Sequence, residues 1–198
     1  MHPYKIAGLS TAHALLSGNS LRNDDEQIEV NLYESRPTFD YKAGAGIQIN
    51  GGMSILNKIN PILFREVKEA ALPLTMVRSR TSPWFKNENP FSTLLELDLD
   101  KLIRSSDIDD LVVDDQVMAY TITRGALQEV MLEELPQDVK RNIKFDSKLV
   151  DMFDSTSFKA NGYCDNSEEG IMCKFSNGSV DGPFDLIIGC DGNTYYSM

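Results

Sequence analysis

The sequence has 198 residues, enough to bury a hydrophobic core, and its composition of 41% hydrophobic and 25% charged residues is that of an ordinary globular protein. Its formal net charge of -11 argues against nucleic acid and anionic membrane surfaces as partners, because both attract basic proteins. It shows neither a signal peptide nor an apolar run near the ~18 residues of a membrane-spanning helix, so we expect a cytoplasmic protein without a membrane segment.

The N-terminal part of the sequence predicts two helices and one strand. Small and apolar residues at helical spacing predict a helix over 7–17, and a polar, turn-rich loop follows it. Apolar and polar residues alternate over 28–34, which predicts a strand. After a long glycine-containing loop, residues 51–70 predict a helix interrupted near Pro61, because proline removes a helical hydrogen bond.

Further along, strands alternate with one clear helix. Residues 75–80 and 92–100 predict antiparallel strands of a second layer, joined by a turn around 87–90. Apolar residues on one face predict an amphipathic helix over 123–135, which ends before Pro136. Short strands are predicted within 142–153, 171–176 and 184–191, the last two joined by the turn SNGS. Within the last of these, DLIIGC is apolar at successive positions, which favours a parallel strand covered on both faces.

The first nucleotide-binding pattern is a glycine in the N-terminal helix together with an acidic residue at the end of the next strand. A helix that carries Gly8 could pack closely on a sheet and hold a pyrophosphate through the free N–H groups of its N-terminus. Glu34 ends a strand, where an acid accepts hydrogen bonds from ribose hydroxyls, although it follows Gly8 by more than the usual ~20 residues. A surface glycine and a solvated glutamate would give the same pattern.

Three later stretches add to this pattern. The glycines of GAGIQIN would let backbone approach a ligand, or would form a plain turn. Arg124 begins a helix, where a cation gains nothing from the helix dipole, so it indicates either a bound anion or a solvated side chain. Asp191 and Gly192 follow a predicted strand, and ligands of open α/β sheets gather at such ends, as ordinary turns also do.

Five stretches, taken together in chain order, resemble the flavoprotein monooxygenases of the aromatic-ring hydroxylase type, the salicylate hydroxylase-like family. They are IAGLSTAHAL, YESR, GAGIQIN, TRGAL and DLIIGCDG. The resemblance spans nearly the whole chain. It implies an α/β fold: a Rossmann-like, glutathione-reductase-type FAD-binding fold of three layers with an inserted antiparallel substrate sheet. We expect residues 1–198 to form a single partial FAD-binding domain, with the inserted sheet at about 73–120.

The resemblance also implies which residues bind FAD. Gly8 would support the helix that holds the pyrophosphate, and Glu34 would bind the adenosine ribose, with Arg36 in the same segment. Ala45 and Gly46 would lie beside the flavin, and Arg124 would contact the cofactor from its helix. Asp191 and Gly192 would belong to a motif that serves both FAD and the nicotinamide donor.

The reaction that the resemblance implies needs NAD(P)H to reduce FAD and molecular oxygen to hydroxylate or epoxidise a small organic substrate, such as an aromatic compound. Because the cofactor supplies this chemistry, we expect no catalytic side chain. Three cysteines and two histidines show no metal-binding spacing, so no metal site is predicted either.

The sequence departs from the family at both ends. Pro3 and Lys5 stand where the first two glycines of the cofactor loop belong, and no strand precedes them. The later GD motif of the family is also missing, so we expect a chain truncated at both ends that folds poorly and binds FAD weakly or not at all. Two alternatives stay open: a catalytically dead remnant or interaction module, and a different FAD oxidoreductase of the amine-oxidase type, over which the order of the motifs favours a hydroxylase.

Overall fold

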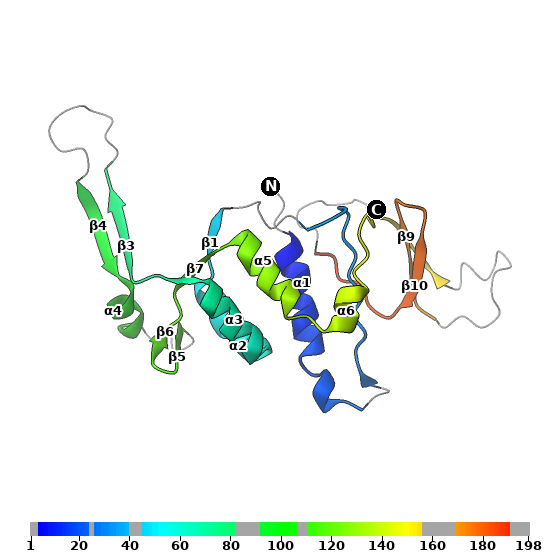
Figure 1. The fold of residues 1–198 in the computed structure, drawn as a ribbon, viewed down its shortest axis with the longest axis horizontal. Helices are drawn as coiled ribbons and strands as arrows, with labels where there is room; N and C mark the ends of the chain where they lie inside the picture. The colour runs from blue at the N-terminus through cyan, green and yellow to red at the C-terminus, as the bar shows by residue number, and fades with distance from the viewer. Residues whose placement is uncertain are drawn as a thin grey trace. The chain divides into compact units, whose positions relative to one another are not determined.

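The computed structural model describes residues 4–23, 26–39, 45–81, 92–106, 111–155 and 169–190. The chain divides into two compact units, shown with all their elements in Figure 1. The first unit comprises Met1–Asp40 and Leu135–Met198, and the second unit comprises Tyr41–Glu134. The second unit is therefore inserted into the sequence of the first. Within the described ranges, no helix is both long and apolar enough to cross a membrane.

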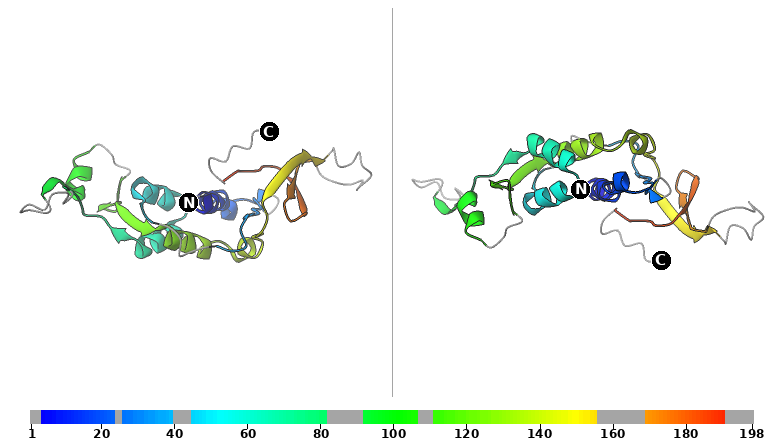
Figure 2. Two further views of the ribbon diagram at one scale, coloured as in Figure 1. Left: turned by 90° about the horizontal axis from the view of Figure 1, so that it is seen from above. Right: turned by 90° about the horizontal axis from the view of Figure 1, so that it is seen from below.

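The first unit combines an N-terminal helix with a three-stranded sheet (Figures 1 and 2). Its sheet is antiparallel, in the order β10-β9-β8. The bounds of its elements are α1 Tyr4–Leu16, the short helix η1 Asn19–Leu21, α6 Gln137–Arg141, β8 Leu149–Asp154, β9 Ile171–Phe175 and β10 Val180–Phe184. Leu9 and Ala12 of α1 are buried, as are Cys173 and Phe175 of β9. The helix predicted over 7–17 is thus confirmed, with an earlier start.

The segment 28–34, predicted to be a strand, is extended but pairs with the segment around Lys144 at a single point. Tyr33 and Lys144 form an isolated parallel bridge. Around it, the amide of Glu34 donates to the carbonyl of Lys144 and the amide of Lys144 donates to the carbonyl of Leu32, both at 2.8 Å. The prediction of a regular strand is therefore wrong, because in the described part of the chain no ladder forms along the rest of the segment.

The segment DLIIGC corrects a second prediction. Residues 185–190 form no strand in the structure, and two of their large apolar side chains face solvent: Leu186 is 68% exposed and Ile188 is 47% exposed. A parallel strand becomes buried on both faces only when neighbouring strands and helices cover it. Among the described residues no strand pairs with this segment, so its apolar sequence does not become a core strand.

The second unit contains a small sheet, two short ribbons and the helices between them in the sequence (Figure 1). Its three-stranded sheet has the order β1-β7-β2, and the ribbons pair β3 with β4 and β5 with β6, all antiparallel. The bounds are β1 Gly46–Gln48, α2 Asn50–Ile59, α3 Pro61–Ala70, β2 Leu72–Pro73, β3 Met76–Arg80, β4 Thr93–Asp98, α4 Leu99–Arg104, β5 Val112–Val113, β6 Gln116–Val117, β7 Tyr120–Thr123 and α5 Arg124–Glu133.

The interruption predicted near Pro61 is confirmed as the boundary between α2 and α3. Asn60 lies between these helices, and its side-chain oxygen accepts hydrogen bonds from the amides of Ile62 and Leu63 at 3.0 and 3.1 Å. Pro61 takes the first helical position, where its missing N–H would have no helical partner in any case. Leu63 then points into the core of the unit and is fully buried.

The other predictions for this unit are largely confirmed. The strands expected over 75–80 and 92–100 form the antiparallel β3–β4 ribbon, although the turn predicted around 87–90 lies outside the described residues. The amphipathic helix is α5, which buries Leu127 and Met131. The short helix α4, which directly follows β4, was not predicted.

Candidate functional site

The second unit brings together three residues that the sequence predicts to bind the cofactor. Strand β1 pairs with β7 so that Gly46 lies opposite Thr123. Helix α5 starts at the next residue, and the hydroxyl of Thr123 caps it by accepting from the amide of Ala126 at 3.2 Å. The amide of Arg124 donates to the carbonyl of Ala45 at 3.3 Å. Ala45 and Gly46 therefore lie beside the N-terminus of the helix that carries Arg124.

Gly46 is not required by the packing of the chain itself. A Cβ built at this position would lie 3.6 Å from the hydroxyl oxygen of Thr121, an ordinary contact distance. The residue is also exposed. Neither steric crowding nor a left-handed backbone explains why residue 46 is a glycine. A ligand that approaches the exposed backbone would explain it, because glycine has no side chain in the way.

Two buried polar atoms near these residues have no partner within the described part of the chain. They are the side-chain oxygen Oδ1 of Asn50, two residues after β1, and the side-chain nitrogen Nε2 of Gln128, one turn along α5 from Arg124. Leaving such a group unsatisfied costs about 1–3 kcal/mol. An acceptor and a donor of this kind fit a polar cofactor that would satisfy them.

Sequence reasoning did not identify Gln128. The available signal was a polar residue on the apolar face of α5, next to the buried Leu127 and one turn before Met131. The side chain at this position, Gln128, is buried, and the residue is only 6% exposed. The hydrophobic pattern alone would place an apolar residue there.

In the first unit, α1 lies close to the segment 185–190. A Cβ built at Gly8 would lie 3.6 Å from the Cβ of Cys190, and the hydroxyl oxygen of Thr11 is 4.0 Å from the sulfur of Cys190. Gly8 is thus placed where the helix and this segment approach each other. The predicted site residues Asp191 and Gly192 directly follow in the sequence but lie outside the described residues, as does Pro3.

Glu34 is held by its own turn and by the parallel bridge. Its carboxylate oxygen Oε1 accepts from the amide of Arg36 at 3.1 Å and from the hydroxyl of Ser35 at 3.4 Å. The carbonyl of Glu34 accepts from the amide of Ser147 at 2.9 Å, and that of Arg36 accepts from the amide of Asp146 at 3.1 Å. The backbone of Glu34 and Arg36 is therefore fixed, and the other carboxylate oxygen of Glu34 makes no hydrogen bond to the described part of the chain.

Comparison with solved structures defines the class of the fold. Neither a protein-family model nor a curated protein matches the sequence. Solved structures that share the mixed α/β fold with antiparallel sheets include a protein crystallised with FAD and a hydroxylase.

One such structure is Klebsiella pneumoniae HpxO complexed with FAD and uric acid, with a TM-score of 0.58 and 17% identity over 89% of this chain and 34% of that chain. Another is 2,6-dihydroxypyridine-3-hydroxylase from Arthrobacter nicotinovorans, with a TM-score of 0.51 and 13% identity over 89% of this chain and 32% of that chain. The chain thus spans about a third of the length of these proteins.

Proposed function

We propose that this chain carries FAD-binding elements of a monooxygenase that uses NAD(P)H and molecular oxygen to oxygenate a small organic substrate. The observation that carries the proposal is the contact between Ala45 and Arg124, with the orphaned polar atoms of Asn50 and Gln128 on the adjoining segments. The fold adds support, because HpxO, which shares it, was crystallised with FAD.

In this proposal the second unit supplies Ala45, Gly46 and Arg124, together with Asn50 and Gln128. The positive charge of Arg124 suits a phosphate or another electron-rich part of the cofactor. The two orphaned atoms suit its polar edge, one as acceptor and one as donor. When bound, FAD supplies the electron transfer and the oxygen chemistry, and the chain supplies binding and orientation.

The first unit would hold the nucleotide half of FAD. We propose that Gly8 supports the pyrophosphate-binding helix α1 and that Glu34 binds the ribose, with Arg36, Asp191 and Gly192 in the same site. The parallel bridge beside Glu34 is a single point of parallel pairing, the direction of pairing on which a Rossmann-like sheet is built. The three-layer, glutathione-reductase-type fold and a single domain with an insertion at about 73–120 stay predictions, as do NAD(P)H use and a cytoplasmic location.

Titration of the full chain with FAD, followed by quenching of flavin fluorescence, tests the proposal. We expect weak, saturable binding that the substitution Arg124→Gln weakens about tenfold, since it removes a charged partner. Arg141→Gln, which removes an exposed arginine of α6, is the matched control and should leave binding unchanged. Absence of saturable quenching up to about 1 mM FAD would contradict the proposal and favour a catalytically dead remnant or interaction module.

A second variant separates a binding role from a structural one. If Nε2 of Gln128 awaits a ligand, Gln128→Leu should raise the free energy of unfolding, because it removes an unsatisfied buried group. The same variant should weaken FAD binding. A loss of stability together with unchanged FAD affinity would show that Gln128 serves the packing of α5 instead.

A further inference from the structure

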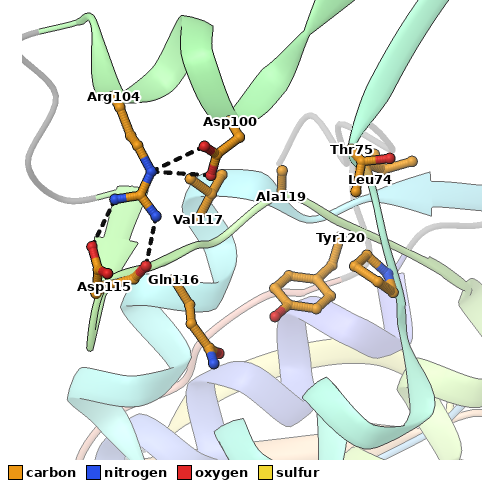
Figure 3. Close-up of a pocket in the computed structure, with 10 residues that line it drawn as sticks. Leu74, Thr75, Asp100, Arg104, Asp115, Gln116, Val117, Ala119 and Tyr120 are labelled. Atoms are coloured by element: carbon orange, nitrogen blue, oxygen red, sulfur yellow. Dashed lines mark hydrogen bonds and ion pairs between the residues drawn. The ribbon is translucent and has the colours of Figure 1, made fainter.

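Charged side chains of the second unit gather at a pocket of about 300 Å³ (Figure 3). Arg104 pairs there with Asp100 and Asp115. These side chains are exposed and satisfy one another, so they form a surface ion-pair network. A cluster in the first unit is different, because it adjoins Glu34, the residue that we propose to bind the ribose of FAD.

The cluster of the first unit is centred on the carboxylate of Asp181 in β10. Its Oδ2 accepts from the hydroxyl of Tyr33 at 2.6 Å and pairs with the ammonium of Lys144. Its Oδ1 accepts from the amide of Gly182 at 3.0 Å. The ring of Tyr33 stacks on Phe175 of β9, with centroids 4.5 Å apart. Both oxygens of Asp181 are thus engaged, and Tyr33 is held at its ring and at its hydroxyl.

Lys144 connects this cluster to the backbone of Glu34. The amide of Glu34 donates to the carbonyl of Lys144, and the amide of Lys144 donates to the carbonyl of Leu32, both at 2.8 Å. The side chain of Lys144 meets that of Tyr33 at Asp181, so backbone and side-chain bonds form a closed ring around the segment. Bonds connected in such a network constrain one another more than isolated bonds do. We therefore expect the ring to fix the position of Glu34 more firmly than its single bridge alone.

The carboxylate of Glu34 lies on the other side of the segment from this cluster. Tyr33 and Glu34 are consecutive in an extended segment, in which successive side chains point to opposite faces. Oε1 of Glu34 accepts from the amide of Arg36 at 3.1 Å, whereas Oε2 makes no hydrogen bond to the described part of the chain. Tyr33 thus holds the segment from one side while the carboxylate faces the other.

We propose that Tyr33 and Asp181 are positioning residues for Glu34, and that they sharpen its selection of a ribose over a sugar that lacks hydroxyls. This inference rests on the proposed function, in which Glu34 binds the adenosine ribose. A carboxylate recognises hydroxyls through hydrogen bonds that weaken steeply with distance and angle. A loosened segment should therefore lose its selectivity for the ribose before the ligand loses the diphosphate contacts proposed for α1.

Calorimetric titration of the full chain with ADP and with 2′,3′-dideoxy-ADP tests the proposal, because ADP is the half of FAD that carries this ribose. We expect ADP to bind at least about tenfold more tightly. Tyr33→Phe keeps the stacked ring and should reduce this preference to about threefold. Glu34→Gln should reduce it to about twofold, and adding Tyr33→Phe to Glu34→Gln should reduce it no further, because both substitutions act through one carboxylate.

Val67→Ala is the matched control for a general loss of stability. It truncates a fully buried side chain of α3 in the second unit, so it destabilises the protein but should leave the preference for ADP unchanged. An undiminished preference in Tyr33→Phe overturns the positioning role and leaves the ribose site intact. Equal binding of the two ligands by the unsubstituted chain, or no saturable binding up to about 10 mM, contradicts the ribose site itself and overturns both proposals.

If Tyr33→Phe does not fold, two other measurements decide. Asp181→Asn keeps the shape of the side chain but removes its charge, and it should also reduce the preference for ADP. In the unsubstituted chain, ADP should shift the amide resonances of Tyr33, Lys144 and Gly182 more than dideoxy-ADP does, because coupling between two sites is reciprocal. An unchanged preference in Asp181→Asn, or equal shifts with both ligands, overturns the positioning role.

Discussion

The hydroxyl of Tyr33 donates to Oδ2 of Asp181 at 2.6 Å, and this bond joins the segment that carries Glu34 to strand β10. The ammonium of Lys144 pairs with the same carboxylate oxygen and lies 5.3 Å from the centre of the Tyr33 ring. The ring itself stacks on Phe175 of β9, with centroids 4.5 Å apart. The Tyr33 side chain thus fastens the extended segment to the sheet of the first unit, where a strand ladder does not.

Tyr33→Phe should therefore destabilise the protein by about 1–2 kcal/mol, since it removes a hydrogen bond to a charged acceptor and keeps the ring stacking. Chemical denaturation monitored by circular dichroism measures this change. Tyr120→Phe is the matched control, because its hydroxyl has no partner in the described part of the chain, and it should not lower stability. Equal losses in the two variants would show that the bond between Tyr33 and Asp181 contributes nothing.

The same pair predicts how stability depends on pH. Burial acts to raise the pKa of Asp181, but hydrogen bonds from Lys144 and Tyr33 outweigh it and hold the pKa below the ordinary 3.8. The stability that this carboxylate contributes is present above pH 3.8 and is lost as the pH falls through its lower folded-state pKa. Unfolding measured at several acidic pH values should show a shallower loss in Asp181→Asn than in the unsubstituted protein.

At alkaline pH the stability of the protein changes with pH in the opposite direction. Burial, then the hydrogen bond to Asp181, raises the pKa of Tyr33 far above the ordinary 10.0. The unfolded chain therefore loses this proton first, and stability falls as the pH rises above 10.0. In Tyr33→Phe this contribution to the alkaline loss should disappear. Unchanged alkaline unfolding curves in that variant would contradict the assignment.

Helix α3 offers a test of the core of the second unit. Leu63 is fully buried, whereas its neighbour Ile62 is 55% exposed. Leu63→Ala should cost about 2–5 kcal/mol, because it leaves a cavity in addition to removing buried apolar surface. Ile62→Ala removes a branched side chain from the exposed face and should cost well under half as much. Thermal unfolding of both variants measures the difference, and similar losses would mean that the face of α3 is assigned wrongly.

The exposed segment 185–190 should tolerate charged substitutions that a buried strand would not tolerate. Because Leu186 and Ile188 face solvent, Leu186→Lys and Ile188→Lys should change the free energy of unfolding by no more than about 0.5 kcal/mol. Lysine buried in a covered parallel strand would instead cost several kcal/mol. Denaturant unfolding of the two variants separates the observed structure from the strand that the sequence predicts.

Sequence reasoning succeeded where the signal is local. Pro61 sets a helix boundary through its missing N–H, and the helix that carries Arg124 follows from its apolar face. The segments 28–34 and 185–190 were misjudged because a strand needs partners distant in sequence, and the pattern of a segment does not reveal whether these partners are present. Gln128 was missed for a related reason, since only the fold shows that its polar atom is buried.

The short elements α4, α6 and β10 were also not predicted. Helices of six and five residues have too few turns for a hydrophobic period to be read. Strand β10 contains Gly182 and Pro183, which usually mark loops. Its pairing with β9 depends on tertiary contacts, including the bond from Tyr33 to Asp181.

The most direct test of the account is a map of where FAD touches the chain. Amide resonances of the isotopically labelled full chain, recorded with increasing FAD, report each residue separately. If the segments around Ala45 and Arg124 bind the cofactor, the largest shifts will fall on Gly46, Asn50, Arg124 and Gln128. An unchanged spectrum, or shifts confined to residues away from these segments, would contradict FAD binding at this site.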